Sequence, residues 1–357
     1  MTLLTKSWTW VLPLLGWLVL VASWADLFSP LITGLVLVGV VLSAVHHAEV
    51  VAHRVGEPFG TLILALAVTV IESGLIVSLM LANREAAITL ARDTVFATCM
   101  IIINLLLGSC LVAAARRQRQ ARFTRTGANA ALSALATLMV LTLVLPNYTT
   151  SIAGPVYTPS QLAFLAIFLL LLYLTFVFVQ TVRNRDYFLP SGELREAPEA
   201  HVAPPSNLRA GTSLGLLMVG LVAVVLMAKS LSDPLDAAVA AAGLPRAVVG
   251  IAIAAIVLLP ESVAAVRAAR ALRLQTSLNL AFGSALATIG LTIPVVAVVS
   301  FFLGLPLVLG LDAKSMVFLA LSLFVAALSI ARGRVTLLHG AVHLVVFAAY
   351  VVTTVIP

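Results

Sequence analysis

The chain has 357 residues, of which 62% are hydrophobic and only 10% are charged, and its mean hydropathy is +1.14. This composition excludes a soluble globular domain and indicates an integral membrane protein. The formal net charge of +7 does not indicate nucleic-acid binding, because the basic residues are scattered between apolar spans in the sequence and form no single patch there.

Eleven apolar segments are long enough to cross a bilayer as helices, which takes about 20 residues each. We expect spans at 8–25, 29–46, 60–82, 93–115, 128–146, 159–182, 212–231, 247–270, 277–303, 315–331 and 336–356. Between the seventh and eighth of these, segment 233–245 carries Gly243 and Pro245 and is expected to be re-entrant or interfacial. The first span is expected to be a retained helix and not a signal peptide, because its apolar stretch is long and tryptophans flank it.

The basic residues predict the orientation of these spans. Most of the 21 lysines and arginines fall on the side of the N-terminus, including the cluster at 116–125. The opposite side has only Arg84, Arg92, Lys229, Arg246 and Lys314. Because cytoplasmic loops are enriched in basic residues, we expect a multi-pass protein of a bacterial inner membrane, with its N-terminus cytoplasmic and its C-terminus outside.

The number of spans also predicts an internal repeat. After the first helix, 1–28, spans two to six (29–182) and seven to eleven (212–357) form two blocks of five, joined by the polar linker 183–211. An odd number of spans in each block inverts the second block relative to the first, a plan common in secondary transporters. The predicted fold is therefore all-α, with about 11 transmembrane helices arranged as a first helix and two inverted five-helix repeats.

Two acidic residues lie inside predicted spans and in matching contexts. Glu72 in TVIESGLIV and Glu261 in LLPESVAAV each follow an apolar run, precede a serine and belong to the second helix of a block. An acid in the membrane interior costs roughly 2.5–3.5 kcal/mol, so it is a functional-site hypothesis by default. No lysine or arginine is predicted at the depth of either acid, which argues against a structural ion pair.

The residues around these acids predict a cation site built from oxygen atoms. Thr69, Ser73 and Ser262 add hydroxyls, and Pro260 frees a backbone carbonyl beside Glu261. Hard cations such as Ca²⁺ prefer oxygen ligands. A carboxylate in a low-dielectric site also favours its protonated form, so a cation and a proton compete for the same group. Such competition is the minimum that antiport requires.

Other polar residues inside the spans are secondary candidates with a structural alternative. Ser284 and Thr288 share a helix face and either line the site or mediate close helix packing, and Asn104 is a further candidate for lining it. His339 and His343 also share a face. A proton relay through His343 is one interpretation, and a hydrogen bond between helices is the other.

The segment HHAEVVAHRVGEPFG leads directly into the Glu72 helix. His46, Glu49 and His53 are spaced to share a helix face, which allows a zinc site or a gate for ion entry. Histidines beside an arginine near the interface are also typical of ordinary surface positions. We treat His53 and Glu57 as candidates for gating.

Three long stretches resemble a known family. They are HAEVVAHRVGEPFGTLILALAVTVIE, LLPESVAAVRAARALRLQTSLNLAFGSALATIGLTIPVV and GRVTLLHGAVHLVVFAAY, and they are similar to the bacterial ChaA-type calcium/proton antiporters of the cation/Ca²⁺ exchanger superfamily. The resemblance covers nearly the whole chain and implies Ca²⁺/H⁺ antiport, with Na⁺/H⁺ or K⁺/H⁺ exchange also found in this branch. It implies that Glu72 and Glu261 bind the cation and exchange the proton. It also marks the family motif positions His53, Gly56, Glu57 and Pro58.

We therefore expect a secondary active antiporter, and not an enzyme, that exports Ca²⁺ in exchange for protons and has no cofactor besides the transported ions. The alternative within this class is a Na⁺/H⁺ or K⁺/H⁺ antiporter with little use of calcium. Alternatives of other classes are an intramembrane metalloenzyme built on His46, Glu49 and His53, and a non-transporting receptor. The expected partners are the lipid bilayer and these ions, without nucleic acid, and the oligomeric state is left open.

Overall fold

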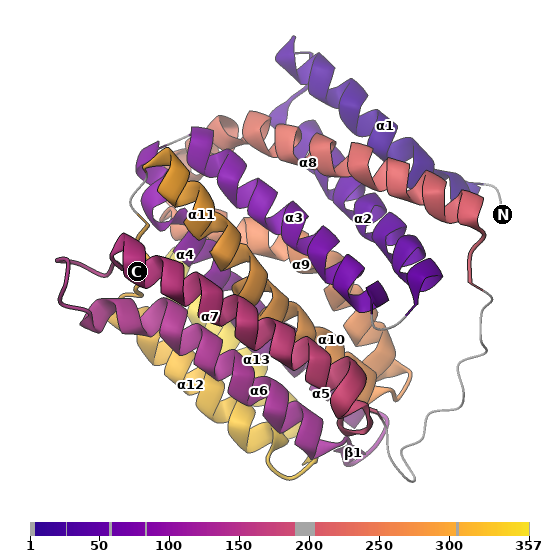
Figure 1. The fold of residues 1–357 in the computed structure, drawn as a ribbon, viewed down its shortest axis with the longest axis vertical. Helices are drawn as coiled ribbons and strands as arrows, with labels where there is room; N and C mark the ends of the chain where they lie inside the picture. The colour runs from indigo at the N-terminus through magenta and orange to yellow at the C-terminus, as the bar shows by residue number, and fades with distance from the viewer. Residues whose placement is uncertain are drawn as a thin grey trace. The chain divides into compact units, whose positions relative to one another are not determined.

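Helices α1 to α13, with short π-helical and 3₁₀-helical turns between some of them, make up most of the described chain (Figure 1). The structure is a computed structural model that describes residues 4–25, 27–56, 59–82, 84–189, 204–304 and 307–356. The chain divides into two compact units, and two of the three boundaries between them fall inside helices α4 and α9.

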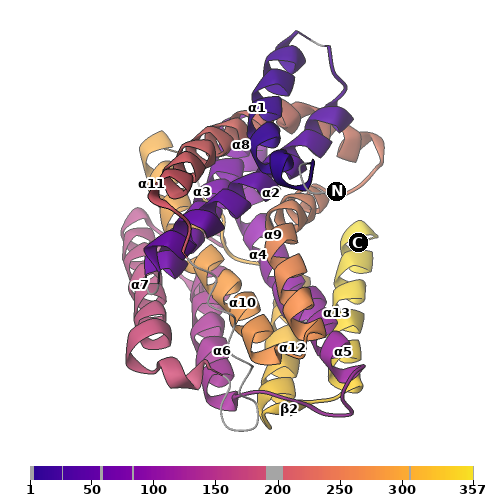
Figure 2. The same cartoon turned by 90° about the vertical axis from the view of Figure 1, so that its right-hand side faces the viewer.

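The first unit comprises residues 1–90 and 202–257. Its helices are α1 (Leu4–Trp24), α2 (Pro30–Val55), α3 (Phe59–Ala82), the first part of α4 (Arg84–Met100), α8 (Asn207–Ala241) and the first part of α9 (Ala247–Arg270). Helix α2 packs against α1, α3 and α8 (Figures 1 and 2). Small residues permit this contact, since a Cβ on Gly220 of α8 would lie only 3.5 Å from the Ala44 side chain of α2.

The second unit comprises residues 91–201 and 258–357. Its helical elements, in chain order, are the rest of α4, η1 (Ile101–Leu106), α5 (Leu107–Ala115), α6 (Arg125–Met139), η2 (Val140–Val144), η3 (Leu145–Tyr148), α7 (Pro159–Phe178), η4 (Val179–Arg183), η5 (Arg185–Tyr187), the rest of α9, α10 (Leu274–Ala287), η7 (Thr288–Thr292), α11 (Ile293–Leu303), α12 (Ala313–Ile330) and α13 (Leu337–Val355). Helix α13 packs on α5, α10 on α6, and α11 on α7. Two short strands, β1 (Ala121–Arg122) and β2 (Arg334–Val335), pair antiparallel.

Two glycines face each other where α5 and α13 cross. A Cβ on Gly340 would lie 2.8 Å from the carbonyl oxygen of Gly108 and 2.7 Å from a methyl group of Val112. A Cβ on Gly108 would lie 2.9 Å from the Cβ of His343. Because neither glycine has a side chain, the two backbones approach closely, as small residues allow in membrane helices.

The predicted number of spans is confirmed: eleven helical segments of the described chain are long and apolar enough to cross a membrane. Two of the segments, Ile88–Ala115 and Leu274–Leu303, contain the π-helical turns η1 and η7 within them. The second span is longer than predicted, because the polar residues after position 46 continue α2 to Val55. It ends at Gly56, whose φ of 77° suits a residue without Cβ.

The prediction of a separate re-entrant or interfacial segment at 233–245 is wrong in its boundaries. Residues 233–241 continue α8, which is a single helix of 35 residues with Pro234 inside it. Proline removes one backbone N–H, but the bonds on either side of it hold the helix together, as they do in other membrane helices. The helix ends at Ala241, and Gly243, two residues later, turns the chain with a φ of 65°.

The helices that carry the two acids correspond closely. Helices α3 and α9 both have 24 residues, and each carries its glutamate just past its middle. The next span in each half then contains a π-helical turn, η1 in the first and η7 in the second. These matches agree with a first helix followed by two five-helix repeats, in which the odd number of spans inverts the second repeat.

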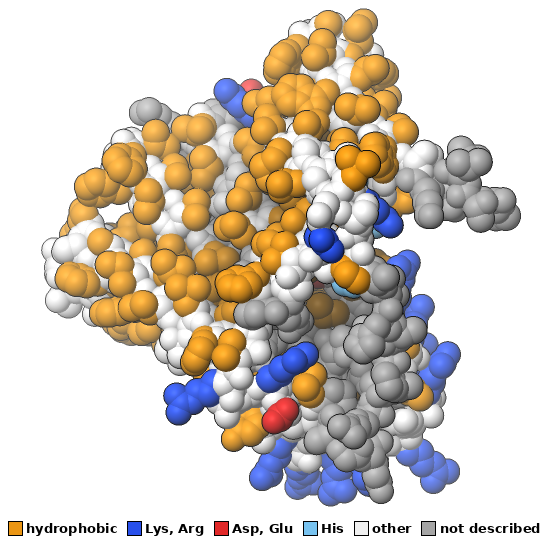
Figure 3. Space-filling model, turned by 45° about the vertical axis from the view of Figure 1, so that its right-hand side comes forward, with side chains coloured by type: hydrophobic (Ala, Val, Ile, Leu, Met, Phe, Trp, Pro, Cys, Tyr) orange, Lys and Arg blue, Asp and Glu red, His pale blue; other side chains and the backbone are white. Residues whose placement is uncertain are grey.

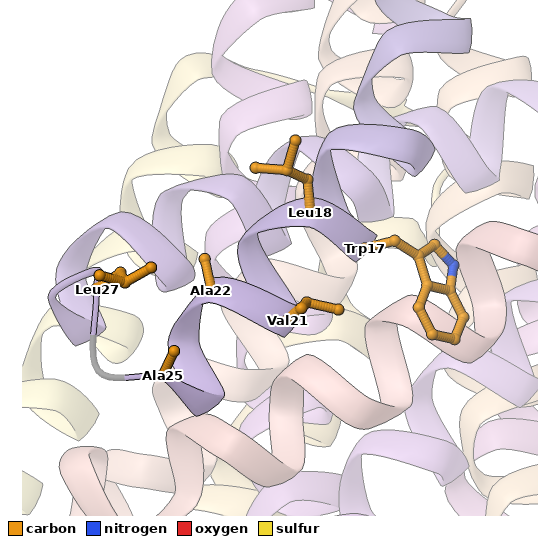
Figure 4. Close-up of a pocket in the computed structure, with 6 residues that line it drawn as sticks. All are labelled: Trp17, Leu18, Val21, Ala22, Ala25 and Leu27. Atoms are coloured by element: carbon orange, nitrogen blue, oxygen red, sulfur yellow. The ribbon is translucent and has the colours of Figure 1, made fainter.

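The outer surface is largely apolar. Figure 3 shows hydrophobic side chains over much of the visible face, as expected for helices that contact lipid acyl chains. In the first unit, a shallow apolar pocket lies along α1 and the residues after it (Figure 4). It is lined by Trp17, Leu18, Val21, Ala22, Ala25 and Leu27. None of these side chains carries an oxygen, so their side chains offer no ligand to a hard cation.

Candidate cation-binding site

Glu72 lies on α3 in the first unit, and its side chain is only 2% exposed. Two hydroxyl groups flank it on the same helix. The Thr69 hydroxyl donates to the carbonyl of Ala65 at 2.8 Å, and the Ser73 hydroxyl donates to the carbonyl of Thr69 at 2.5 Å. Both hydroxyl protons are therefore used within the helix, while the hydroxyl oxygens keep lone pairs that a cation can use.

Close packing fixes where this part of α3 lies along α8. A Cβ on Gly74, two residues after Glu72, would lie 2.6 Å from a methyl group of Val225. The carboxylate of Glu72 thus sits beside a tight helix contact, among helices that are largely apolar.

Glu261 lies on α9 in the second unit and is partly buried. The Ser284 hydroxyl of α10 donates a hydrogen bond to its Oε2 atom. Pro260, inside the same helix, removes the N–H that would otherwise bond a carbonyl one turn earlier. The hydroxyl bonded to Glu261 therefore comes from a neighbouring helix, and a role of Ser284 in lining a cation site stays a prediction. Ser262 is also partly buried on α9.

Tyr173 of α7 was not among the sequence candidates, yet it lies close enough to Glu261 to interact with it electrostatically. Its side chain is 3% exposed. A Cβ on Gly290 in η7 would lie 2.6 Å from the Cβ of Tyr173, so the glycine leaves the space that the tyrosine occupies. Thr288, at the start of the same π-helical turn, is buried with 3% exposure.

Asn104 lies in the π-helical turn η1 and is completely buried. Its amide nitrogen donates to the Ser322 hydroxyl of α12 at 2.8 Å, and its Oδ1 lies 3.4 Å from Nδ1 of His343 on α13. The other ring nitrogen of His343 lies 3.2 Å from the Ser329 hydroxyl. Because the amide oxygen can only accept, Nδ1 donates and Nε2 of the neutral ring accepts from Ser329.

This buried polar network joins three spans of the second unit. His343 forms the bonds between helices that were the alternative to a proton relay, and the relay itself stays a prediction. His339, predicted on the same face, has another partner: its Nδ1 accepts a hydrogen bond from the backbone N–H of Thr336 and caps the start of α13. The two histidines therefore have different surroundings.

The histidine segment of α2 does not bring its predicted residues together. Glu49 and His53 are exposed and His46 is partly buried, and His46 packs its ring against Trp8 and His47. In the described part of the chain, no group of three or more histidine, cysteine, aspartate or glutamate side chains could hold a metal ion. Glu57 and Pro58 lie outside the described residues.

His47, which was not singled out, has the clearer structural role. Its Nε2 lies 2.8 Å from the carbonyl oxygen of Thr9 on α1, and the Ser43 hydroxyl donates to the same oxygen at 2.6 Å. Pro13 lies four residues after Thr9 and has no N–H, so this carbonyl lacks its usual helical donor. The spacing of Thr9 and Pro13 was the sequence signal for this contact between α1 and α2.

Ser322 and Ser329 were also missed. Each is a single hydroxyl in a long apolar helix, and nothing in the sequence connects either one with Asn104 or His343. Hydroxyl oxygens lie beside each acid: those of Thr69 and Ser73 flank Glu72 on its own helix, and that of Ser284 bonds Glu261. Carboxylate and hydroxyl oxygens of this kind are suited to hard cations and to protons.

A helical membrane protein with a matching acid in the second helix of each of two inverted repeats is a secondary transporter of cations. The chain belongs to the sodium/calcium exchanger protein family, whose model matches residues 15–182 and 212–356. The unmatched stretch between these two regions coincides with the predicted linker 183–211.

Two relatives support this assignment, and one solved structure shares the fold. The chain is 45% identical over 356 residues to y4hA of Sinorhizobium fredii (strain NBRC 101917 / NGR234), which carries the name of an ionic transporter, covering 98% of this chain and 96% of that protein. It is 34% identical over 323 residues to the sodium-potassium/proton antiporter ChaA of Escherichia coli (strain K12), covering 89% and 87%. The structure of YfkE shares the fold, with a TM-score of 0.75 at 14% identity, covering 98% of this chain and 100% of that chain.

Proposed function

We propose that this membrane exchanger exports Ca²⁺ in exchange for protons, and that Glu72 and Glu261 each take up cation and proton in turn. Thr69, Ser73, Ser262, Ser284, Thr288 and Asn104 are the supporting ligands or lining residues in this proposal. The chain acts as a transporter and not as an enzyme, and the ions are its substrates. It needs no cofactor.

The observation that carries the proposal is the pair of matching acids. Glu72 is 2% exposed in a 24-residue apolar helix. Glu261 is partly buried in another helix of 24 residues and accepts a hydrogen bond from Ser284. A carboxylate in such surroundings is stable when it is protonated or bound to a cation, and costly when it is charged and bare. Exchange of one partner for the other follows from this requirement.

The choice of ion rests on oxygen chemistry and on similar proteins. YfkE, which shares the fold, is named a Ca²⁺/H⁺ antiporter, and all-oxygen sites suit Ca²⁺. ChaA is named a sodium-potassium/proton antiporter, so sodium or potassium exchange with little use of calcium is the second candidate function. The same two acids serve in both cases.

The direction of transport depends on orientation. We place the chain in a bacterial inner membrane with a cytoplasmic N-terminus and an outside C-terminus, because most arginines fall on the side of the N-terminus. A proton gradient directed inward then drives the cation outward.

The test uses purified protein in liposomes with an imposed pH gradient, with ⁴⁵Ca²⁺ uptake and lumenal pH followed together. We expect calcium to enter as protons leave. The same vesicles are then challenged with Na⁺ and with K⁺. Exchange of Na⁺ or K⁺ with no calcium flux would favour the second candidate over the calcium proposal. No exchange with any of the three ions would refute antiport.

Matched variants test whether Glu72 and Glu261 are the acids that exchange cation and proton. Glu72→Gln and Glu261→Gln remove one carboxylate each without changing the size of the side chain, and both are expected to stop coupled exchange. Asp233→Asn in the first unit and Asp186→Asn in the second make the same chemical change at exposed positions. Transport that persists in the double variant Glu72→Gln, Glu261→Gln would disprove the assigned roles.

A further inference from the structure

The short β1–β2 pair brings together two loops that are far apart in the sequence. Ala121 pairs with Val335 and Arg122 pairs with Arg334, and the backbone N–H of Phe123 donates to the carbonyl of Gly333 at 3.0 Å. Ala121, Phe123 and Val335 are buried and anchor the ladder to the second unit. The loop after α5 and the loop after α12 therefore form one surface.

This surface is strongly basic. Its exposed arginines are Arg116, Arg117, Arg119, Arg122, Arg125, Arg332 and Arg334. Neither 116–126 nor 331–336 contains an aspartate or a glutamate. Figure 3 shows Lys and Arg side chains gathered at the end of the molecule where β1 lies in Figure 1. The sequence expectation of scattered basic residues is thus wrong here, because the strand pairing gathers residues that the sequence separates.

The register of the ladder puts two arginines directly opposite each other. Side chains opposite one another in an antiparallel pair lie close together, and like charges in that position are destabilising. An anion bridging the two guanidinium groups turns this repulsion into attraction. Guanidinium groups bind phosphate oxygens through two parallel hydrogen bonds, and all seven basic side chains of this surface are arginine.

The surroundings identify the source of the phosphate. The arginines flank the ends of transmembrane helices whose side chains face outward, with Leu328 of α12 57% exposed and Leu338 of α13 70% exposed. A bound phosphate at this place lies at the level where acyl chains of the bilayer begin. Clustered basic residues beside membrane helices are favourable sites for anionic headgroups.

We propose that the arginine surface formed by loops 116–125 and 332–334 binds the headgroup of an anionic phospholipid, with Arg122 and Arg334 holding its phosphate. A lipid with two phosphates, such as cardiolipin, engages more of these side chains than a lipid with one. The binding site belongs to the second unit alone and is independent of which cation the protein transports.

Membrane orientation by itself explains the number of arginines on this side but not their pairing across a strand. The test therefore compares two double variants with the same loss of charge. Arg122→Gln, Arg334→Gln removes the facing pair. Arg54→Gln, Arg209→Gln removes two exposed arginines of the first unit, on the same predicted side of the membrane.

The protein is placed in nanodiscs of a zwitterionic lipid with increasing cardiolipin, and retained lipid is measured by native mass spectrometry beside the melting temperature. We expect cardiolipin to be retained by the wild type and by the Arg54, Arg209 variant, and to raise their melting temperatures. Retention by the Arg122, Arg334 variant is expected to fall about tenfold or more.

Three results would overturn the proposal. The first is no preference of the wild type for cardiolipin over the zwitterionic lipid. The second is equal loss of binding in both double variants, which would indicate a general effect of charge. The third is equal stabilisation by inorganic phosphate in detergent without lipid, which would indicate a site for a free anion.

Discussion

The two acids have the same place in their helices but different surroundings. Around Glu72 in the first unit, Thr69 and Ser73 use their hydroxyl protons on carbonyls of their own helix, and Gly74 packs closely on α8. Around Glu261 in the second unit, the hydroxyl of Ser284 comes from another helix. A close backbone contact with α8 therefore lies beside the first acid, and a hydrogen bond from α10 reaches the second.

The same contrast extends beyond the acids. The second unit contains the network from Ser322 through Asn104 and His343 to Ser329, which crosses three spans. In the first unit, the contact between α1 and α2 uses a backbone carbonyl, that of Thr9, as the acceptor for Ser43 and His47. The two units therefore differ in the polar contacts that join their helices.

The largest expected effect is the loss of exchange when either acid is neutralised. Removing one partner of a buried charge costs of order 3–5 kcal/mol, so cation exchange in Glu72→Gln and in Glu261→Gln should fall at least ~100-fold. We expect the melting temperature of each variant to change little, since glutamine retains the shape. Rates in liposomes are compared with melting curves of the same samples. Near-normal exchange in only one variant would show that the two acids are not equivalent.

A smaller effect is expected from breaking the network of the second unit. His343→Leu leaves Asn104 and Ser329 each without one partner, and we expect the free energy of unfolding to fall by about 2 kcal/mol. Thr69→Val in the first unit removes only a bond within one helix and should cost less than about 1 kcal/mol. Unfolding is measured in detergent. An equal fall in the free energy of unfolding for the two variants would show that hydrogen bonds between helices are no more important in the second unit than bonds within a helix are in the first.

Glycine contacts give a matched pair inside the second unit. Gly340→Ala places a Cβ against the backbone of Gly108 and should destabilise the fold by about 1–3 kcal/mol. Gly283 of α10 has no atom within 4 Å of the corresponding position, so Gly283→Ala should be neutral or stabilising by up to ~1 kcal/mol. Melting temperatures of the two variants should shift in opposite directions. A rise in melting temperature for both variants would mean that helix propensity, and not the close crossing, decides.

The smallest effect concerns the bond to Glu261. Ser284→Ala removes the hydroxyl that donates to Oε2, and we expect the KM for the transported cation to rise about tenfold, because a bond to a partly exposed charged group contributes about 1.5 kcal/mol, the low end of the usual range. Ser284→Thr keeps a hydroxyl and should restore most of the affinity. Ser73→Ala in the first unit should raise the KM less, since its proton is bonded within α3. A larger effect at Ser73 would reverse the comparison.

The spans and the two acids could be predicted from the sequence, because the membrane imposes requirements that residues close together in the chain must meet. A span needs about 20 apolar residues in a row, and an acid inside such a run is conspicuous at once, which is how the eleven spans and the positions of Glu72 and Glu261 were found. The inverted repeat followed from counting the spans. All of these properties depend on neighbours along the chain.

The tertiary structure decided what depends on distant residues. Hydropathy could not tell that α8 continues past Pro234, because the neighbouring bonds of that helix outweigh the proline. It could not pair Asn104 with His343, or Arg122 with Arg334, since the partners in each case are more than 200 residues apart. The two compact units also combine segments from both halves of the chain. Hydrogen bonds and charges act over a few ångströms in space, and only the folded chain brings these groups that close together.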